Sequence, residues 1–185
     1  MVMFHNSFVE PSLIVLALFL CFAPSFCSER IVRVRDICSK HFVNPKKCAI
    51  ILNSIPGVAT RGEDLGKLSL DVINLANVSA LHTITLFNDL IKNSTSDTDL
   101  RQRYSICSSN YDNILIALTI GKDSFTSGDF DDMHFRVSAV ADIVEHCRPI
   151  APGSSELRKN YEYLEVVGIT LEILADYLAC KYIVI

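Results

Sequence analysis

The sequence predicts an all-α protein, an up-down-up-down four-helix bundle that follows a short helical hairpin and is tied by two disulfides. Apolar residues recur at spacings of three and four along four long segments, and no run shows convincing strand-like alternation. Short polar loops separate these segments, which favours antiparallel packing of successive helices. Cysteines lie on the same segments, where pairing between neighbours would join adjacent helices.

The first 27 residues are typical of a secretory signal peptide. Residues 13–22 read LIVLALFLCF, an apolar run of about ten residues, shorter than the roughly 20 needed to span a bilayer. Small residues follow, and we expect cleavage between Ser25 and Ser28. A signal anchor is the alternative, because no Lys or Arg precedes the apolar run. The expected product is a secreted, extracellular chain.

Residues 28–185 are expected to form one domain. The chain has 17 basic and 21 acidic residues and a formal charge of −4, which argues against nucleic-acid binding because that function uses a basic stripe. No second apolar run is expected to reach membrane length, so we expect no membrane attachment after cleavage. We also expect a monomer in the free state.

Residues 28–56 predict the helical hairpin. The segment 29–38 has its apolar residues on one side, and the turn VNPKKC follows it. Asn44 suits a helix cap and Pro45 suits the first turn of a second helix, which stops at Pro56-Gly57. Each arm carries one cysteine.

Residues 62–181 predict the four-helix bundle. The expected helices span about 62–92, about 97–121, from Thr126 or Ser127 to Pro149, and about 154–180. Gly121 is expected to end the second helix, and the polar residues after it to form a loop. The apolar stripe of this helix repeats every four or three residues, at Leu100, Tyr104, Cys107, Tyr111, Ile114 and Leu118.

Five cysteines follow the predicted signal peptide. In an oxidising compartment four of them would pair, and four cysteines permit three pairings. We favour Cys38–Cys48 and Cys107–Cys147, because each pair joins neighbours in the sequence. Cys180 is then left as a free thiol or as a cysteine that bonds to another chain. The sequence has no CxxC pair and no His at metal-ligand spacing, so we expect no metal and no cofactor.

Two sequons predict candidate glycosylation sites in a secreted chain, at Asn77 and Asn93. Asn93 lies in a polar, loop-like stretch and is the better candidate. Asn77 falls inside a predicted helix and must face water to be modified.

The outer face of the second bundle helix is the candidate partner-binding surface. Ile116 is an apolar residue off the core stripe and a possible interface anchor. An ordinary solvated face is the alternative for each polar residue, and a histidine near a helix C-terminus is favoured there by the helix dipole. The candidate contacts are Ser109, Asn110, Asp112, Asn113, Ile116 and His146.

Two other function classes are weaker. An enzyme would use acids such as Asp129, Asp131 and Asp132, but the sequence has no nucleophile elbow, phosphate loop or metal spacing. A secreted helical signalling protein would need long crossover connections, which are absent. We therefore predict a binding protein without catalytic activity.

Four segments together resemble the plant invertase and pectin methylesterase inhibitors: ICSKHFVNPKKC, LRQRYSICSSNYDNILIAL, FTSGDFDDMHFRVSAVADIVEHC and LRKNYEYLEVVGITLEILADYL. The resemblance implies a four-helix bundle with a hairpin, the disulfide pairing favoured above, and secretion to the cell wall (the apoplast) or the vacuole. It implies inhibition by binding. One branch covers the cleft of pectin methylesterase in a one-to-one complex, and the other occupies the substrate site of acid invertase.

The resemblance favours pectin methylesterase as the target, because the Pro-Lys-Phe motif of the better-known invertase inhibitors is absent. An inhibitor of cell-wall or vacuolar acid invertase is the alternative. A secreted protein of the same fold without inhibitory activity is the second alternative.

Overall fold

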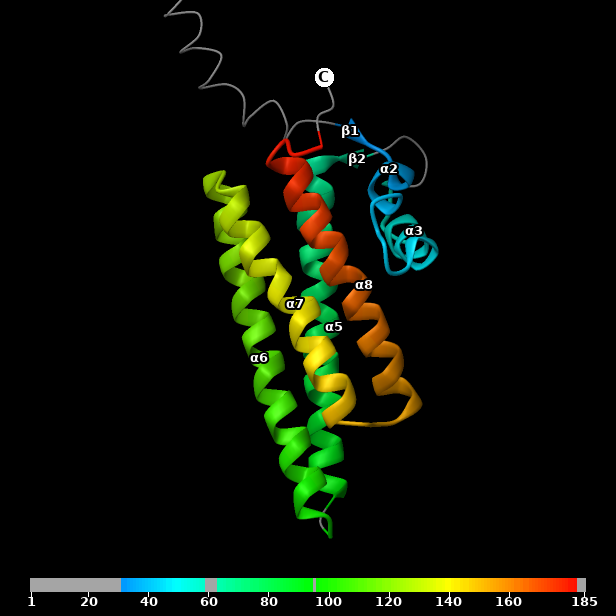
Figure 1. The fold of residues 1–185 in the computed structure, drawn as a ribbon, viewed down its shortest axis with the longest axis vertical. Helices are drawn as coiled ribbons and strands as arrows, with labels where there is room; N and C mark the ends of the chain where they lie inside the picture. The colour runs from blue at the N-terminus through cyan, green and yellow to red at the C-terminus, as the bar shows by residue number, and fades with distance from the viewer. Residues whose placement is uncertain (1–30, 59–62, 95, 183–185) are drawn as a thin grey trace, which may run out of the picture.

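The computed structural model describes residues 31–58, 63–94 and 96–182. Within these ranges a four-helix bundle stands beside a small N-terminal hairpin (Figure 1). The elements are β1 (Ile31–Val32), α2 (Val34–Cys38), α3 (Pro45–Asn53), β2 (Glu63–Asp64), α5 (Leu65–Asn93), α6 (Thr98–Ser127), α7 (Phe130–Ile150) and α8 (Ser155–Leu178). The predicted signal peptide lies outside the described residues.

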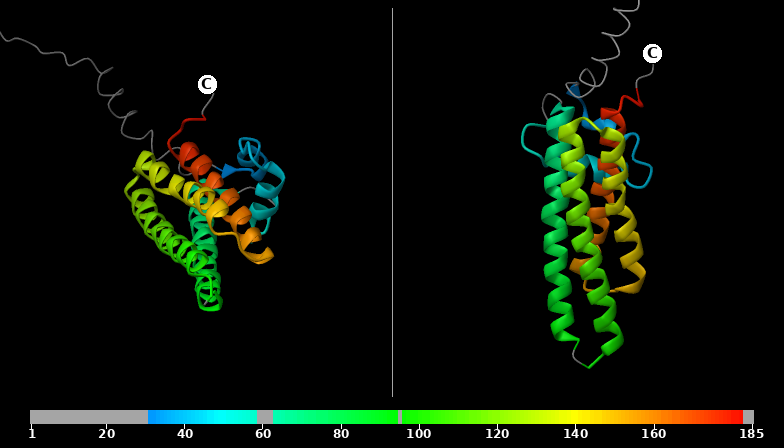
Figure 2. Two further views of the ribbon diagram at one scale, coloured as in Figure 1. Left: turned by 60° about the horizontal axis from the view of Figure 1, so that its bottom comes forward. Right: turned by 90° about the vertical axis from the view of Figure 1, so that its left-hand side faces the viewer.

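The four long helices run alternately up and down, as predicted, and each packs against the next (Figures 1 and 2). α8 also packs against α5, which closes the bundle. The seam predicted for the second helix is its buried face, since Tyr104, Cys107, Tyr111, Ile114 and Leu118 are all buried. Helical period therefore identified the core face correctly.

An aromatic cluster fills the bundle near the α7–α8 connection. The ring of Phe87 lies 5.3 Å from that of Tyr111 and 6.3 Å from that of Tyr161, measured between centroids. The Tyr161 hydroxyl donates to the carbonyl of Ala151 at 2.9 Å, and that of Tyr104 donates to Pro152 at 2.6 Å. Burial raises the pKa values of Tyr111 and Tyr161, so both stay neutral.

α6 is longer than the sequence predicts. Gly121 does not end it, because the helix continues to Ser127 and Gly128 forms the cap with a φ of 79°. Gly121 is instead a point of close approach, where an added Cβ would lie 3.2 Å from Cγ1 of Val137 on α7. The polar stretch after Gly121 is thus helical, and only Gly128 and Asp129 connect α6 to α7.

The two predicted disulfides are present. Cys38 bonds to Cys48 and Cys107 bonds to Cys147, with Cα atoms 5.6 and 5.7 Å apart. The first joins α2 to α3 and the second joins α6 to α7. Because α6 extends to Ser127, Cys107 and Cys147 lie at similar distances along their helices from the turn that joins α6 to α7. The two cysteines are therefore opposite each other.

The prediction of a free thiol at Cys180 is wrong, because this cysteine is disulfide-bonded. The other four described cysteines bond to each other, so its partner lies outside the described residues. The sequence analysis considered only the five cysteines that follow the predicted signal peptide, and pairing neighbours among them left Cys180 over.

The hairpin packs on α8 through a few specific contacts. Nε2 of the buried His41 lies 3.2 Å from the carbonyl of Val166, and Nδ1 accepts from the backbone N–H of Asn44 at 3.0 Å. Lys47 pairs with Glu162 of α8 at 2.9 Å. A two-residue antiparallel pairing of β1 with β2, which the sequence did not predict, also links the hairpin segment to the start of α5.

One expectation about membrane length needs correction. By length and composition α5 could cross a bilayer, with a mean hydropathy of 1.3 and 33% of its most apolar window buried. In the structure it packs between α6 and α8, and part of its apolar surface belongs to the bundle core.

Candidate functional site

The candidate site is the outer surface between α6 and α7. The residues at the turn between these two helices explain why they lie side by side. Asp129 caps α7 by accepting from the backbone N–H of Asp132 at 3.0 Å, immediately after the left-handed Gly128 that ends α6. The two-residue turn makes the helices antiparallel neighbours, and the Cys107–Cys147 disulfide ties them further along. This surface is therefore built on two covalently linked helices.

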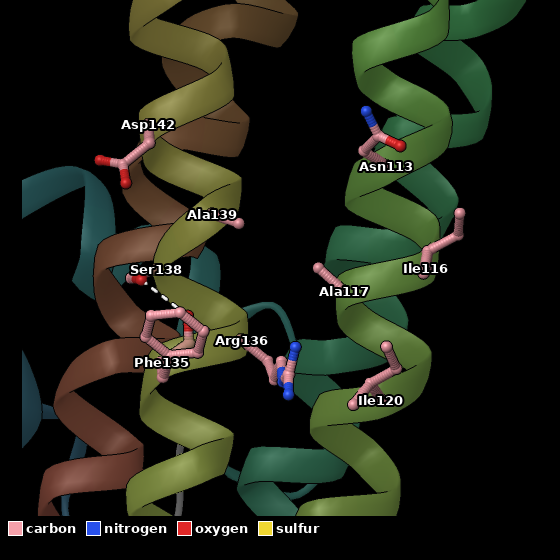
Figure 3. Close-up of a pocket in the computed structure, with 9 residues that line it drawn as sticks. All are labelled: Asn113, Ile116, Ala117, Ile120, Phe135, Arg136, Ser138, Ala139 and Asp142. Atoms are coloured by element: carbon pink, nitrogen blue, oxygen red, sulfur yellow. Dashed lines mark hydrogen bonds between the residues drawn. The ribbon is translucent and has the colours of Figure 1, made fainter.

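A shallow groove of about 280 Å³ lies along this surface (Figure 3). Its apolar side chains are unusually exposed, with 58% of Ile116 and 68% of Phe135 open to solvent. Ile120 is also exposed. The lining residues are Asn113, Ile116, Ala117 and Ile120 from α6, and Phe135, Arg136, Ser138, Ala139 and Asp142 from α7.

The structure brings two of the six predicted contacts, Asn113 and Ile116, into the groove. Ser109 and Asn110 lie one turn away on the same side of α6 by helical spacing. Asn110 also points its amide at the disulfide, with Nδ2 3.9 Å from Sγ of Cys147.

The remaining two predicted contacts lie outside the groove. Asp112 is exposed but does not line it, and its position on α6 turns away from that of Asn113. His146 is exposed and continues the α7 line of Phe135, Ala139 and Asp142 toward the disulfide. Whether any of the six residues contacts a partner stays a prediction.

The sequence analysis missed the α7 wall of the groove. Phe135 lies between the core positions Met133 and Val137 and is therefore off the buried stripe. This position in the sequence could have identified Phe135, because a large aromatic residue off the buried stripe is expected to be exposed. Ile120 gave the same signal on α6, two residues after the core position Leu118.

The charged groups at the Phe135 end hold one another in place. Nε of Arg136 donates to Asp132 at 3.1 Å, and its guanidinium lies 5.4 Å from the centroid of the Phe135 ring. The Ser124 hydroxyl donates to the other oxygen of Asp132. This hydrogen bond, with Arg136, lowers the pKa of Asp132, so its carboxylate stays charged.

The acids considered for catalysis have structural roles. Asp129 is the cap of α7, Asp131 pairs with Lys181 at 2.9 Å, and Asp132 is held by Ser124 and Arg136. Among the described residues no group of three His, Cys, Asp or Glu side chains is arranged to hold a metal. The groove offers an apolar surface with a few polar groups, which suits binding.

Both predicted glycosylation sites lie away from this groove. Asn93 is exposed and is the last residue of α5. Asn77 is half-buried and lines a second groove between α5 and α6, together with Thr119 and Lys122. Glycosylation at either site stays a prediction.

The sequence of the chain is similar to those of known plant proteins. No family model matches the chain. The pectinesterase inhibitor of Actinidia deliciosa is 31% identical over 144 residues, which cover 77% of this chain and 74% of the relative. The chain belongs to the pectinesterase inhibitor family. Pectinesterase inhibitor 2 of Arabidopsis thaliana is 25% identical over 150 residues, covering 79% of this chain and 84% of that relative.

Solved structures support the same fold. The crystal structure of a mutant form of a pectin methylesterase inhibitor from Arabidopsis superposes with a TM-score of 0.67 at 21% identity. A second crystal structure, of a pectin methylesterase inhibitor from Arabidopsis thaliana, gives a TM-score of 0.56 at 23% identity. Each comparison covers 76% of this chain and 93% of the solved chain. This chain therefore has the fold of two solved pectin methylesterase inhibitors.

Proposed function

We propose that this protein is a secreted inhibitor that blocks the active-site cleft of pectin methylesterase in a one-to-one complex, through the outer surface of α6 and α7. The observation that carries the proposal is the exposed apolar groove on two disulfide-linked helices. The names of the relatives support pectin methylesterase as the target. The signal-like first 27 residues support secretion to the cell wall.

The mechanism is steric. Ile116 and Phe135 present apolar surface whose burial against a partner is favourable, and the surrounding polar side chains provide a rim. The disulfide and the tight turn fix both helices before binding, which lowers the entropy cost of ordering the surface. A bound helical face then excludes the polymeric substrate.

The test is titration of the purified protein into a plant pectin methylesterase and, separately, an acid invertase, at several values between about pH 5 and about pH 7. Inhibition of the methylesterase, with a one-to-one complex in light scattering, is the expected result. Inhibition of the invertase alone would show that the protein is an invertase inhibitor instead. Inhibition of neither enzyme would leave a protein of this fold without inhibitory activity.

Two variants, Ile116→Asp and Phe135→Asp, test whether the α6–α7 groove is the surface that binds the enzyme. Each places a charge in the buried centre of the proposed interface and is expected to weaken inhibition at least about tenfold. Val78→Asp is the matched control, because Val78 is 66% exposed on α5 and does not line the groove. If all three variants inhibit equally well, the binding surface lies elsewhere.

A further inference from the structure

The charge of the molecule is divided between its two parts. Residues 31–58, which contain the hairpin, hold five basic residues and one acidic residue. The described bundle residues, 63–94 and 96–182, hold ten basic and eighteen acidic residues. A small cationic module therefore stands on the side of an anionic body, packed on α8 and away from α6 (Figure 1).

Only some of these cations help to hold the hairpin in place. Lys47 pairs with Glu162 and Lys40 lies 5.0 Å from the centroid of the Tyr182 ring, so both help to hold the hairpin. Arg33, Arg35 and Lys46 are exposed and form no ion pair with the described residues. Lys46 also lies in the first turn of α3, where the helix dipole disfavours a cation.

The hairpin also exposes apolar side chains. Phe42 is 85% exposed in the loop between α2 and α3, and the neighbouring Val43 is exposed as well. Ile50 is 70% exposed and follows Lys46 by four residues, so both lie on the outer face of α3. A module that exposes both an aromatic ring and cations without an ion pair suits a ligand that carries carboxylates and apolar C–H surface.

We propose that the hairpin is a second binding site, which takes a polyanion of uronic-acid carboxylates. Arg33, Arg35 and Lys46 contact the carboxylates, and the ring of Phe42 packs on the C–H face of a sugar. The choice of polymer rests on the proposed function, because an esterase that acts on pectin leaves free carboxylates on the chain. The acidic bundle does not prevent this contact, because charges more than about 8 to 10 Å away are largely screened at physiological salt.

The position of the hairpin makes the two sites compatible. The groove lies between α6 and α7, whereas the hairpin contacts α8. An inhibitor held on de-esterified polymer through the hairpin would still present its α6–α7 surface. Its local concentration would then be highest where ester groups have already been removed.

The experiment measures binding of the full chain to polygalacturonate, without any esterase, at increasing NaCl concentration. We expect binding at low salt that weakens as salt rises, and no binding to a neutral galactan. The double variant Arg35→Glu, Lys46→Glu should bind polygalacturonate about tenfold more weakly, because four units of charge change at exposed positions. Phe42→Ala should bind about threefold more weakly, through loss of the ring contact.

The matched control is Arg101→Glu, Lys159→Glu, which makes the same change in net charge on exposed bundle residues. Arg101 is near the N-terminus of α6, at the opposite end of the bundle from the hairpin (Figure 1). Glutamate at position 46 suits the helix dipole, so misfolding does not explain a loss of binding by that variant. Unfolding transitions matching wild type verify this.

The control double variant is expected to bind like wild type. Equal weakening in both double variants would show a nonspecific charge effect and overturn the proposal. Failure of wild type to bind polygalacturonate at low salt would overturn it as well. So would tighter binding to vesicles of phosphatidylserine and phosphatidylcholine, since the hairpin would then be a lipid-binding site. None of these outcomes bears on inhibition of the esterase, which is measured separately.

Discussion

The bundle and the hairpin are stabilised in different ways. The bundle buries an apolar stripe from each of four long helices, and its aromatic cluster joins residues of α5, α6 and α8. The hairpin helices have five and nine residues, lengths at which an isolated helix is not stable in water. One disulfide, His41 and the Lys47–Glu162 pair hold it to itself and to α8.

The two parts should therefore respond differently to mutation. In the bundle, packing between helices carries the stability, so changes in volume or in cross-links should affect unfolding of the whole domain. A few contacts stabilise the hairpin, so their loss should unfold the hairpin or detach it from α8 while the bundle stays folded. The predictions below separate these two responses.

The largest effect is expected from the bundle disulfide. Replacing Cys107 and Cys147 by Ala should lower the free energy of unfolding by about 4 kcal/mol, because the cross-link closes a long loop in the unfolded chain. The Cys38→Ala, Cys48→Ala variant should instead raise hydrogen exchange in 31–58 with a smaller change in the main transition. Calorimetry and hydrogen exchange measure the two effects. Equal losses in the main transition would show that both parts unfold as one unit.

A smaller effect is expected at Gly168, where α7 and α8 approach each other closely. A Cβ at Gly168 would lie 2.9 Å from the backbone nitrogen of Ala141 and 3.1 Å from Cγ1 of Val140. Gly168→Ala should therefore force the helices apart and cost about 2 kcal/mol in chemical denaturation. Gly128→Ala is the comparison, because that site has open space but a φ of 79°, and its cost of about 1 kcal/mol is local backbone strain. A harmless Gly168→Ala would contradict the close packing.

The smallest effect is a pH dependence confined to the hairpin. His41 is 2% exposed, burial lowers its pKa, and the nearby carboxylate of Glu165 acts in the opposite direction. Protonation of Nδ1 would remove the acceptor of the Asn44 N–H. Because the folded pKa is below the unfolded value, docking of the hairpin is strongest above the usual pKa of histidine and weakens as pH falls.

Hydrogen exchange at about pH 7 and about pH 5, corrected for the intrinsic rate, measures this effect. Exchange in 31–58 should increase at the lower pH, while protection in the core of α6 stays constant. His41→Gln removes the titrating group and keeps an amide that can donate to Val166, so its hairpin should respond less to pH. A wild-type hairpin that is equally protected at both pH values would show that His41 does not control docking.

Much of the fold was predictable because it depends on local rules. The period of Tyr104, Cys107 and Tyr111 identified the buried face of α6, and Asn44 caps α3 as predicted. Gly121 was misread because glycine is the favoured residue just after a helix, and only the position of Val137 shows how little room a side chain would have there. The groove was half predicted, since Ile116 was identified and Phe135 was not.

The helices and their buried stripes follow from the sequence alone, because they depend on residues a few turns apart. The sequence also favoured the two cysteine pairs, since each joins neighbouring helices. Only the tertiary structure shows which exposed residues face each other across α6 and α7, and how close α8 comes to α7 at Gly168. Those features depend on the rotation and spacing of whole helices, which are determined by packing of the complete core rather than by any single segment.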